Sequence, residues 1–481
     1  MLRDGAAGAP SDVSSRGFIA DAEAFAAKHR TRSIFKALKF YTRCNDYEFD
    51  FLIRKIYASS IESSQYVHES ALKTLFGVLL LPFHLIATKR LLWKARALTM
   101  YNVDTPDEAY FRTRYADIYS ALKGTKRVTP RYSGGICGHD TTEPASVSIS
   151  PRALLLFLVC PLVAIPLYFF CLASGLNIMR SYRNALGLYA TYDGYFRRYP
   201  CERFITYAED TNHPSRYIAF RQNGGRSLIA VQNGERGAHP SWSFGMVDVY
   251  FVFGAYYTGL LKEAGYHAGS VFPVGSLSLN MHYARLNAAL RRIEYDIVYI
   301  DNGTLVPPDY GGLAPDVARS EELALAHLGR FKAAHPGLRV AYQLRPYGGN
   351  AAHRAGALAA LRRCFTGEID ILENTGGGES YDNIRAARLV INFQSTMGFE
   401  AFMLGTKALF VNYSGHANET LCDDPRFQLD GSDKSYKAFE AKVEELLGLE
   451  LAGPPEVALR RHAAFDGRVQ ERIAAAINGI G

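Results

Sequence analysis

Short apolar stretches alternate with helix-length amphipathic stretches from Ser181 to the end of the sequence. The apolar stretches are rich in β-branched residues, as is typical of parallel strands that are covered on both faces. The first group lies at residues 204–207, 228–231, 247–253 and 271–274, and the second at 295–300, 340–344, 369–372, 389–391 and 408–411. The alternation predicts an α/β chain with two Rossmann-like sheets, and the boundary between them falls between Gly275 and Glu294.

The first part of the chain has a different texture. Residues 1–16 are small and polar, which predicts disorder, whereas apolar residues recur at helical spacing between 18 and 67. This second stretch is a predicted helical leader, which packs either on the rest of the protein or on a membrane. The predicted plan is a disordered start and helical leader at 1–68, membrane-associated apolar segments with a basic connector at 69–180, and two Rossmann-like domains at 181–280 and 281–481.

Two stretches within residues 69–180 contain no Asp, Glu, Lys or Arg. Residues 74–88 are too short to span a bilayer as a helix, whereas residues 153–179 are long enough but contain Pro161 and Pro166. If both stretches crossed the membrane, the basic residues between them would lie outside, against the tendency of short basic loops to stay in the cytoplasm. A kinked re-entrant hairpin is therefore favoured, with a single span at 153–179 or a buried helix as the alternatives.

Charge and cysteine content indicate which partner and which cellular compartment to expect. The chain has 481 residues and a formal net charge of +7, and between Lys89 and Arg131 ten Lys and Arg face four Asp and Glu. This stretch resembles no nucleic-acid-binding module, so anionic lipid is the expected partner and nucleic acid is not. The seven cysteines are scattered, and the start of the sequence has no apolar signal segment. We therefore expect a reducing compartment, on the cytoplasmic face of the inner membrane.

The stretch from Asn392 to Gly415 combines a strand, a hydroxyl-rich turn, a helix and a second strand. Ligands of open α/β sheets bind beyond the carboxyl ends of the strands, where helix N-termini offer N–H groups. Gln394, Ser395 and Thr396 occupy this place, and if Thr396 caps the helix, Glu400 lies one turn further on the same face. A phosphate contact and a ribose contact fit this spacing, and so does an ordinary capped helix with a favourably placed acid.

Other strands of the second sheet end in residues that suit a nucleotide. Asn302 follows the first strand with a glycine and a threonine, and Arg345 and Tyr347 follow the next, where Arg345 is a permanent cation with a forked donor geometry. Asn374 and Gly376 follow the third strand in a glycine-rich loop that is predicted to enclose the base. A surface arginine before a proline turn remains the alternative for Arg345.

The first sheet carries candidate catalytic groups. Glu209 and Asp210 follow the strand at 204–207, where a carboxylate suits a general base or a nucleophile, although Asp210 also suits a helix cap. The loop after the next strand offers further polar groups toward an acceptor or a donor sugar, and a turn at Ser276 leaves the sheet; the predicted acceptor or cleft residues are Gln232, Asn233, Glu235, His239 and Ser276.

Several of these segments resemble GT-B glycosyltransferases of bacterial surface-carbohydrate synthesis, including enzymes of Kdo-containing capsules, polysialic acid and glycerophosphate polymers. Ser395, Thr396, Gly398, Glu400 and Ala401 match the S-T-x-G-x-E-A pattern of that group. The loop at 231–237 resembles its I-Q-H-G loop, with Asn233 in place of the histidine. The resemblance implies a GT-B fold of two Rossmann-like domains that face across a cleft, with acceptor binding by residues 181–280 and nucleotide-sugar binding by residues 281–481.

The resemblance also implies an activity. We expect a membrane-associated glycosyltransferase that moves a sugar from a nucleotide-sugar donor to a surface polysaccharide, such as a capsule of the cell envelope, or to a lipid-linked glycan. No D-x-D pair ends a strand, so metal-independent transfer without a cofactor is expected. A CDP-linked polyol-phosphate transferase and a catalytically inactive scaffold of a polysaccharide assembly complex are the alternatives.

Overall fold

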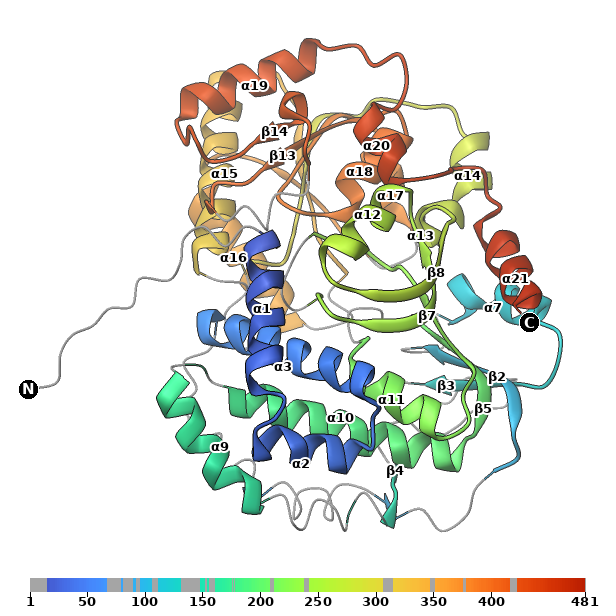
Figure 1. Cartoon of the computed structure of the whole chain (residues 1–481). Coiled ribbons are helices and arrows are strands. Elements are labelled where there is room, and N and C mark those ends of the chain that lie inside the picture. Colours follow the sequence, from blue (N-terminus) through green and yellow to red (C-terminus); the bar gives the residue numbers. More distant parts are fainter. Residues whose placement is uncertain are drawn as a thin grey trace, which may run out of the picture.

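Two six-stranded parallel sheets organise the chain (Figure 1). The computed structural model describes residues 15–66, 79–80, 90–91, 96–105, 111–130, 148–151, 154, 161–174, 176, 178–207, 212–237, 242–305, 315–346, 351–374, 378–415 and 422–480. The first sheet has the order β3 (Lys126–Pro130), β2 (Thr99–Thr105), β5 (Cys201–Thr206), β6 (Ser227–Val231), β7 (Met246–Val252) and β8 (His267–Pro273). The second has the order β11 (Asp370–Leu372), β10 (Val340–Gln343), β9 (Tyr295–Ile300), β12 (Ala387–Asn392), β13 (Lys407–Val411) and β14 (Gln428–Leu429). Each of the nine predicted strands overlaps an observed one, which confirms the α/β class and the two sheets.

Strands β2 and β3 were not predicted, because they lie in the stretch interpreted as a membrane-associated connector. They carry polar residues that are buried with partners inside the sheet, so no apolar run marks them. Asn102 of β2 donates to the Tyr195 hydroxyl and accepts from Thr129 of β3. The basic residues of β3 also make hydrogen bonds within the fold. Lys126 Nζ donates to two carbonyls, and the buried Arg127 donates to the carbonyl of Ala97.

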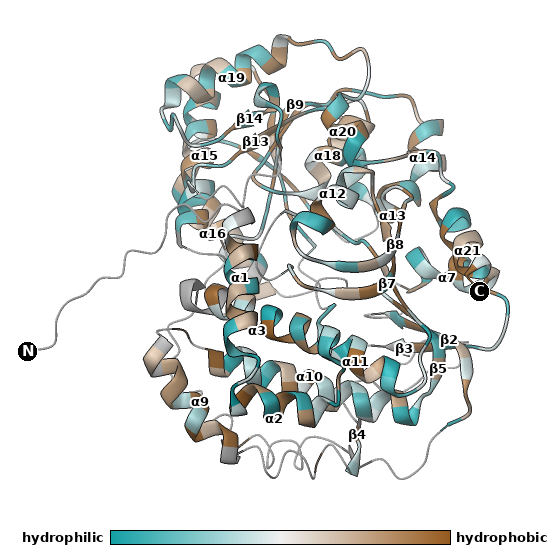
Figure 2. Ribbon diagram, viewed as in Figure 1, coloured by the Kyte–Doolittle hydropathy of each residue, from teal (hydrophilic) through white to brown (hydrophobic). Residues whose placement is uncertain are grey.

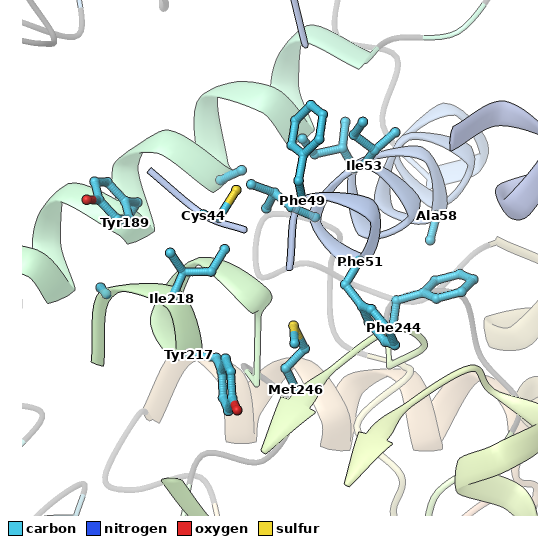
Figure 3. Close-up of a cluster of buried hydrophobic side chains, with 14 of the residues drawn as sticks. Cys44, Phe49, Phe51, Ile53, Ala58, Tyr189, Tyr217, Ile218, Phe244 and Met246 are labelled. Atoms are coloured by element: carbon cyan, nitrogen blue, oxygen red, sulfur yellow. The ribbon is translucent and has the colours of Figure 1, made fainter. Parts of the chain in front are cut away.

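The helical leader packs on the first sheet. It consists of α1 (Ser15–His29), α2 (Ser33–Thr42) and α3 (Asp46–Tyr66), which lie with α10 (Ile178–Arg198) and α11 (Pro214–Gln222) against one face of the sheet. Figure 3 shows the contact between these helices and β7, in which Phe49, Ile218 and Met246 gather in one buried cluster. Of the two alternatives for the leader, the structure therefore shows packing on the protein.

The opposite face of the first sheet is covered by helices from distant parts of the sequence. A π-helical turn at Phe111–Tyr115 leads into α7 (Ala116–Ala121), and α21 (Val469–Gly479) packs beside it. Ile473 and Ile477 of α21 are buried with residues of the first sheet, including Ile229 and Phe251. The end of the chain thus returns to the first domain, while α12 (Tyr256–Glu263) connects β7 to β8.

The predicted apolar stretch at 153–179 contains α9 (Pro161–Ser174), which packs beside α2 and α10 (Figure 2). Across the part of the chain that the structure describes, no helix is long and apolar enough to cross a membrane. Apart from Leu79 and Leu80, the apolar stretch at 74–88 lies outside the described residues. A short parallel pair, β1 (Arg90–Leu91) and β4 (Ser148–Ile149), lies near α10.

The second sheet is enclosed by helices on both faces. They are α15 (Pro315–Ala334), α16 (Ala351–Cys364), α17 (Glu379–Arg385), α18 (Thr396–Met403) and α19 (Tyr436–Gly448), and a short 3₁₀ turn lies at Pro425–Phe427. Two short helices, α13 (Leu277–Asn280) and α14 (Tyr283–Ala288), join the two sheets, and α20 (Glu456–Arg461) begins the return to the first domain. The resulting two-domain arrangement is the one that the GT-B resemblance implies.

Candidate functional site

Three strand-end loops of the second sheet meet at Asn302. This residue follows β9, the strand that lies between β10 and β12. Its side-chain oxygen accepts a hydrogen bond from the Gln394 N–H after β12, at 3.3 Å, and its carbonyl oxygen accepts one from Arg345 Nη1 after β10, at 3.0 Å. The structure thus brings together three residues that the sequence predicted as donor contacts.

Arg345 lies exposed over the loop that follows β9. Gly303 has a φ of +73°, and an added Cβ there would overlap the Arg345 side chain, so the close approach requires glycine. The cation is therefore held at the carboxyl edge of the sheet while its guanidinium remains accessible to solvent. Such a forked donor suits a phosphate.

Glu321 of α15 lies beneath these loops and was not predicted. It is buried, and its carboxylate accepts hydrogen bonds from Asn302 N and Nδ2, at 3.3 and 3.2 Å, and from the Thr304 hydroxyl. Burial and the neighbouring carboxylate of Asp301 raise the pKa of Glu321 to about 8. A sequence signal exists, because Glu321 lies in the apolar stripe of α15 with Val317, Ala324 and Leu328, where a buried acid needs partners.

Ser395 caps α18. Its hydroxyl accepts from the Met397 N–H at 3.3 Å, so the expectation that Thr396 is the cap is wrong by one residue. Ser395 has the extended backbone that a cap requires, whereas Thr396 is already helical. The Thr396 hydroxyl instead accepts from the Glu235 N–H of the first domain at 2.9 Å, which places the start of α18 at the contact between the domains.

Glu400 is buried at the same interdomain contact. Its two carboxylate oxygens accept hydrogen bonds from Ser276 of the first domain, at 2.5 Å, and from the Tyr381 hydroxyl, at 3.0 Å. Burial raises the pKa of Glu400, and these hydrogen bonds and the His462 side chain offset only part of that effect. The structure therefore joins Ser276 and Glu400, while the contact between Glu400 and a ribose stays a prediction.

Glu235 binds the returning segment, which begins at Arg461 and His462 and leads back to the first domain. Its carboxylate is 1% exposed and accepts from Arg461 Nη1 and His462 Nε2, both at 3.0 Å, and from the Tyr257 hydroxyl. Burial opposes ionisation, but the His462 hydrogen bond and the Arg461 charge outweigh it and lower the pKa of Glu235. Arg461 also lies between the rings of Tyr256 and Phe399, 3.9 and 4.5 Å from their centroids.

The other residues predicted in this loop fix its backbone. Gln232 Oε1 accepts from the Phe253 N–H and its Nε2 donates to the Gly234 carbonyl, each at 2.8 Å. Asn233 Nδ2 donates to the Tyr207 carbonyl at 3.0 Å, and its oxygen accepts from Arg236 at 2.7 Å. Asn233 therefore links this loop to Tyr207, two positions before Glu209.

Several predicted residues lie outside the described residues, namely Glu209, Asp210, His239, Tyr347 and Gly376. Asn374 is half-buried after β11. Within the described ranges, no three or more His, Cys, Asp or Glu side chains are grouped so that they could hold a metal ion. A groove of about 780 Å³ lies elsewhere, at the starts of β10 and β11, and contains none of the predicted site residues.

No protein-family model matches the chain, and no curated protein matches it. Solved structures with a similar arrangement include the UDP-GlcNAc 2-epimerase of Methanocaldococcus jannaschii in complex with UDP-GlcNAc and UDP, which is 9% identical with a TM-score of 0.49 over 80% of this chain and 100% of that one. The UDP-bound MnaA of S. aureus is 11% identical with a TM-score of 0.49 over 80% and 96%. The wall teichoic acid polymerase TagF is 9% identical with a TM-score of 0.43 over 91% and 98%.

Proposed function

We propose that this protein is a glycosyltransferase that binds a nucleotide-sugar donor at the loops after β9, β10 and β12. The observation that carries the proposal is the hydrogen bonding of Asn302, which joins these loops at the carboxyl edge of a parallel sheet and leaves Arg345 exposed beside them. This edge is where open α/β sheets bind nucleotides. In this proposal Arg345 contacts the diphosphate, and the N-terminus of α18 faces it with N–H groups and a positive dipole end.

The first domain supplies the chemistry in this proposal. Glu209 or Asp210 acts as the general base toward an acceptor hydroxyl or as the nucleophile toward the anomeric carbon. They are the third and fourth residues after β5, and Asn233 donates to the carbonyl of Tyr207, the residue that follows the strand. The direct bond between Glu235 N–H and Thr396 supports a site that both domains share. The leaving diphosphate is stabilised by Arg345.

The narrower part of the proposal concerns the acceptor and the location. The resemblance of Ser395, Thr396, Gly398, Glu400 and Ala401 to surface-carbohydrate enzymes supports a surface polysaccharide or lipid-linked glycan as the acceptor. In this proposal the enzyme acts at the cytoplasmic face of the membrane.

Calorimetric titration with UDP, CDP, CMP and GDP tests the donor site. We expect one of these nucleotides to bind and Arg345→Ala to weaken that binding about tenfold or more, because the substitution removes a charge-assisted hydrogen bond to phosphate. Arg339→Ala is the matched control, since Arg339 precedes β10 and Arg345 follows it. Equal affinities of the Arg345 variant and the wild type would remove Arg345 from the site.

Product analysis with the corresponding nucleotide-linked donors then tests transfer. Transfer of a sugar supports the proposal, whereas transfer of a polyol phosphate from a CDP-linked donor would contradict it. Polymer synthesis that survives Glu209→Gln together with Asp210→Asn in cells would remove the proposed catalytic carboxylates and favour a scaffold.

A further inference from the structure

Helix α9 presents apolar side chains on its outer face as well as its inner face. Its sequence contains no charged residue. Ile165 and Phe169, one turn apart, are 55% and 63% exposed, and Pro166 and Ala173 are exposed on the same side. Figure 2 shows the helix in brown at the lower left edge of the molecule. A helix that is apolar on both sides is typical of a position between the protein core and a second apolar phase.

The inner face of α9 is fixed by aromatic packing. Phe170 is buried, and its ring lies 6.0 Å from that of Phe35 and 5.1 Å from that of His29, measured between centroids. Leu167 is buried in the same cluster. Because these contacts set the rotation of the helix, Ile165 and Phe169 are held outward by the fold.

A cationic corner adjoins this helix. Residues 28–43, which run from the end of α1 through α2, contain six Lys and Arg and no Asp or Glu. The guanidinium of Arg32 lies 5.1 Å from the centroid of the Phe170 ring, which places the corner directly beside α9. Phe40 of α2 is 71% exposed. The exposed cations are Lys28, Arg30, Arg32, Lys36 and Arg43, of which Arg30 lies 4.0 Å from Asp50.

We propose that the outer face of α9 and this cationic corner form a surface that docks in the plane of an anionic phospholipid bilayer. At about 1.5 Å per residue, the 14 residues of α9 extend about 21 Å, less than the ~30 Å of a bilayer's hydrocarbon core. The apolar side chains enter the boundary between headgroups and acyl chains, and the cations pair with anionic headgroups. A second copy is a poorer occupant, because a two-fold contact brings the same cationic corner toward itself.

This surface differs from the one that the sequence suggested. The expectation that the basic connector at 89–131 meets the headgroups stays a prediction; two of its cations, Lys126 and Arg127, are bonded inside the first domain. The proposed docking surface lies on the leader and on the apolar stretch that contains α9. It places the donor site on a protein that rests on the membrane, and it does not depend on which nucleotide binds.

Co-sedimentation of the full chain with vesicles tests the proposal. We expect binding to vesicles of phosphatidylcholine and phosphatidylglycerol in equal amounts, little binding to phosphatidylcholine alone, and weaker binding as salt rises. Ile165→Ser with Phe169→Ser is expected to lower the partition coefficient about tenfold or more, since it removes two apolar side chains from the contact. Arg32→Glu with Lys36→Glu is expected to abolish the preference for the anionic vesicles.

Matched controls lie in the second domain. Leu459 of α20 is 53% exposed, and Lys437 of α19 is exposed, so Leu459→Ser with Lys437→Glu should leave vesicle binding unchanged. Thermal unfolding and nucleotide titration of the α9 variant should match the wild type, which separates loss of docking from misfolding and from failure of the donor site. Equal vesicle binding by the α9 variant and the control would overturn the proposal. So would light scattering that shows a dimer which Phe169→Ser dissociates, because a second copy would then be the occupant.

Discussion

The protonation state of Glu321 determines the charge beneath the predicted phosphate site. Its carboxylate is buried next to Asp301, and the titratable groups that face it are Asp301 and Tyr299 of the β9 end and Cys364 of α16. With a pKa raised to about 8, Glu321 is mostly neutral at pH 7. A bound phosphate is therefore repelled less than it would be by an ionised Glu321.

We predict that nucleotide affinity falls as the pH rises through about 8 and that Glu321→Gln removes this alkaline limb. The folded pKa lies above the usual value of about 4.5, so the unfolded chain ionises first and the wild type loses stability between about pH 4.5 and 8. The Gln variant should lack that loss, which is on the order of a few kcal/mol. Titration calorimetry and denaturant unfolding across this pH range measure both effects. An alkaline limb that persists in the variant would assign it to another group.

Glu400 is a second buried acid whose role can be separated by substitution. Gln at this position keeps an acceptor for the Ser276 or Tyr381 hydroxyl and removes the charge. If Glu400 also reaches the ribose, we expect Glu400→Gln to weaken nucleotide binding about tenfold, the usual cost of a charged hydrogen bond. Unchanged affinity by calorimetry, in a variant that still folds, would limit Glu400 to joining the two domains.

At the scale of single elements, the cap of α18 can be compared with the cap of α19. Ser395 accepts from Met397 N–H, and Ser435 accepts from Ala438 N–H at the start of the helix that follows the edge strand β14. Replacing either serine with alanine should cost about 1 kcal/mol of stability. Only Ser395→Ala should also lower nucleotide affinity, because only α18 begins beside Asn302 and Gln394. Equal affinities of the two variants would mean that the start of α18 does not contact the nucleotide.

The elements that sequence could predict are those in which burial and apolarity coincide. The nine predicted strands carry apolar runs, and the start of α18 was placed within one residue from its hydroxyl pair. Strands β2 and β3 were not predicted, because Asn102, Asp104 and Thr129 are polar and yet buried with partners. The periodicity of the local sequence does not show whether a polar side chain is hydrogen-bonded to a residue far away in the chain.

The residues of the candidate site also divide into those that the sequence could predict and those that it could not. The strand-end residues Asn302, Arg345 and Gln394 were predictable from their place after strands, and the structure brings them together. The partners of Glu235 were not predictable, because Arg461 and His462 lie 226 and 227 residues further along the chain. An acid in a loop suggests a ligand, whereas its enclosure by the returning chain is known only from the three-dimensional fold.

At the scale of the whole molecule, Glu235 joins three parts of the chain. Its backbone N–H donates to Thr396 of the second domain, and its carboxylate accepts from Arg461 and His462 of the returning segment. Beyond that segment, α21 is buried against the first sheet. The returning segment therefore couples the two domains through one buried ion pair and one helix.

We predict that Glu235→Gln separates the unfolding of the two domains. The substitution leaves the Arg461 charge buried without its carboxylate, which costs about 3–5 kcal/mol. The folded pKa of Glu235 is lowered, so the ion pair stabilises the wild type above about pH 4.5, and this stabilisation is lost as the pH falls through the folded value. Calorimetric scans should show one transition for the wild type at neutral pH and two for the variant.

The control is Glu373→Gln, which removes an exposed ion pair with Arg354 and should keep the single transition. If the Glu235 variant also unfolds in one transition, the domains are coupled by their remaining contacts, and the role assigned to the returning segment is wrong.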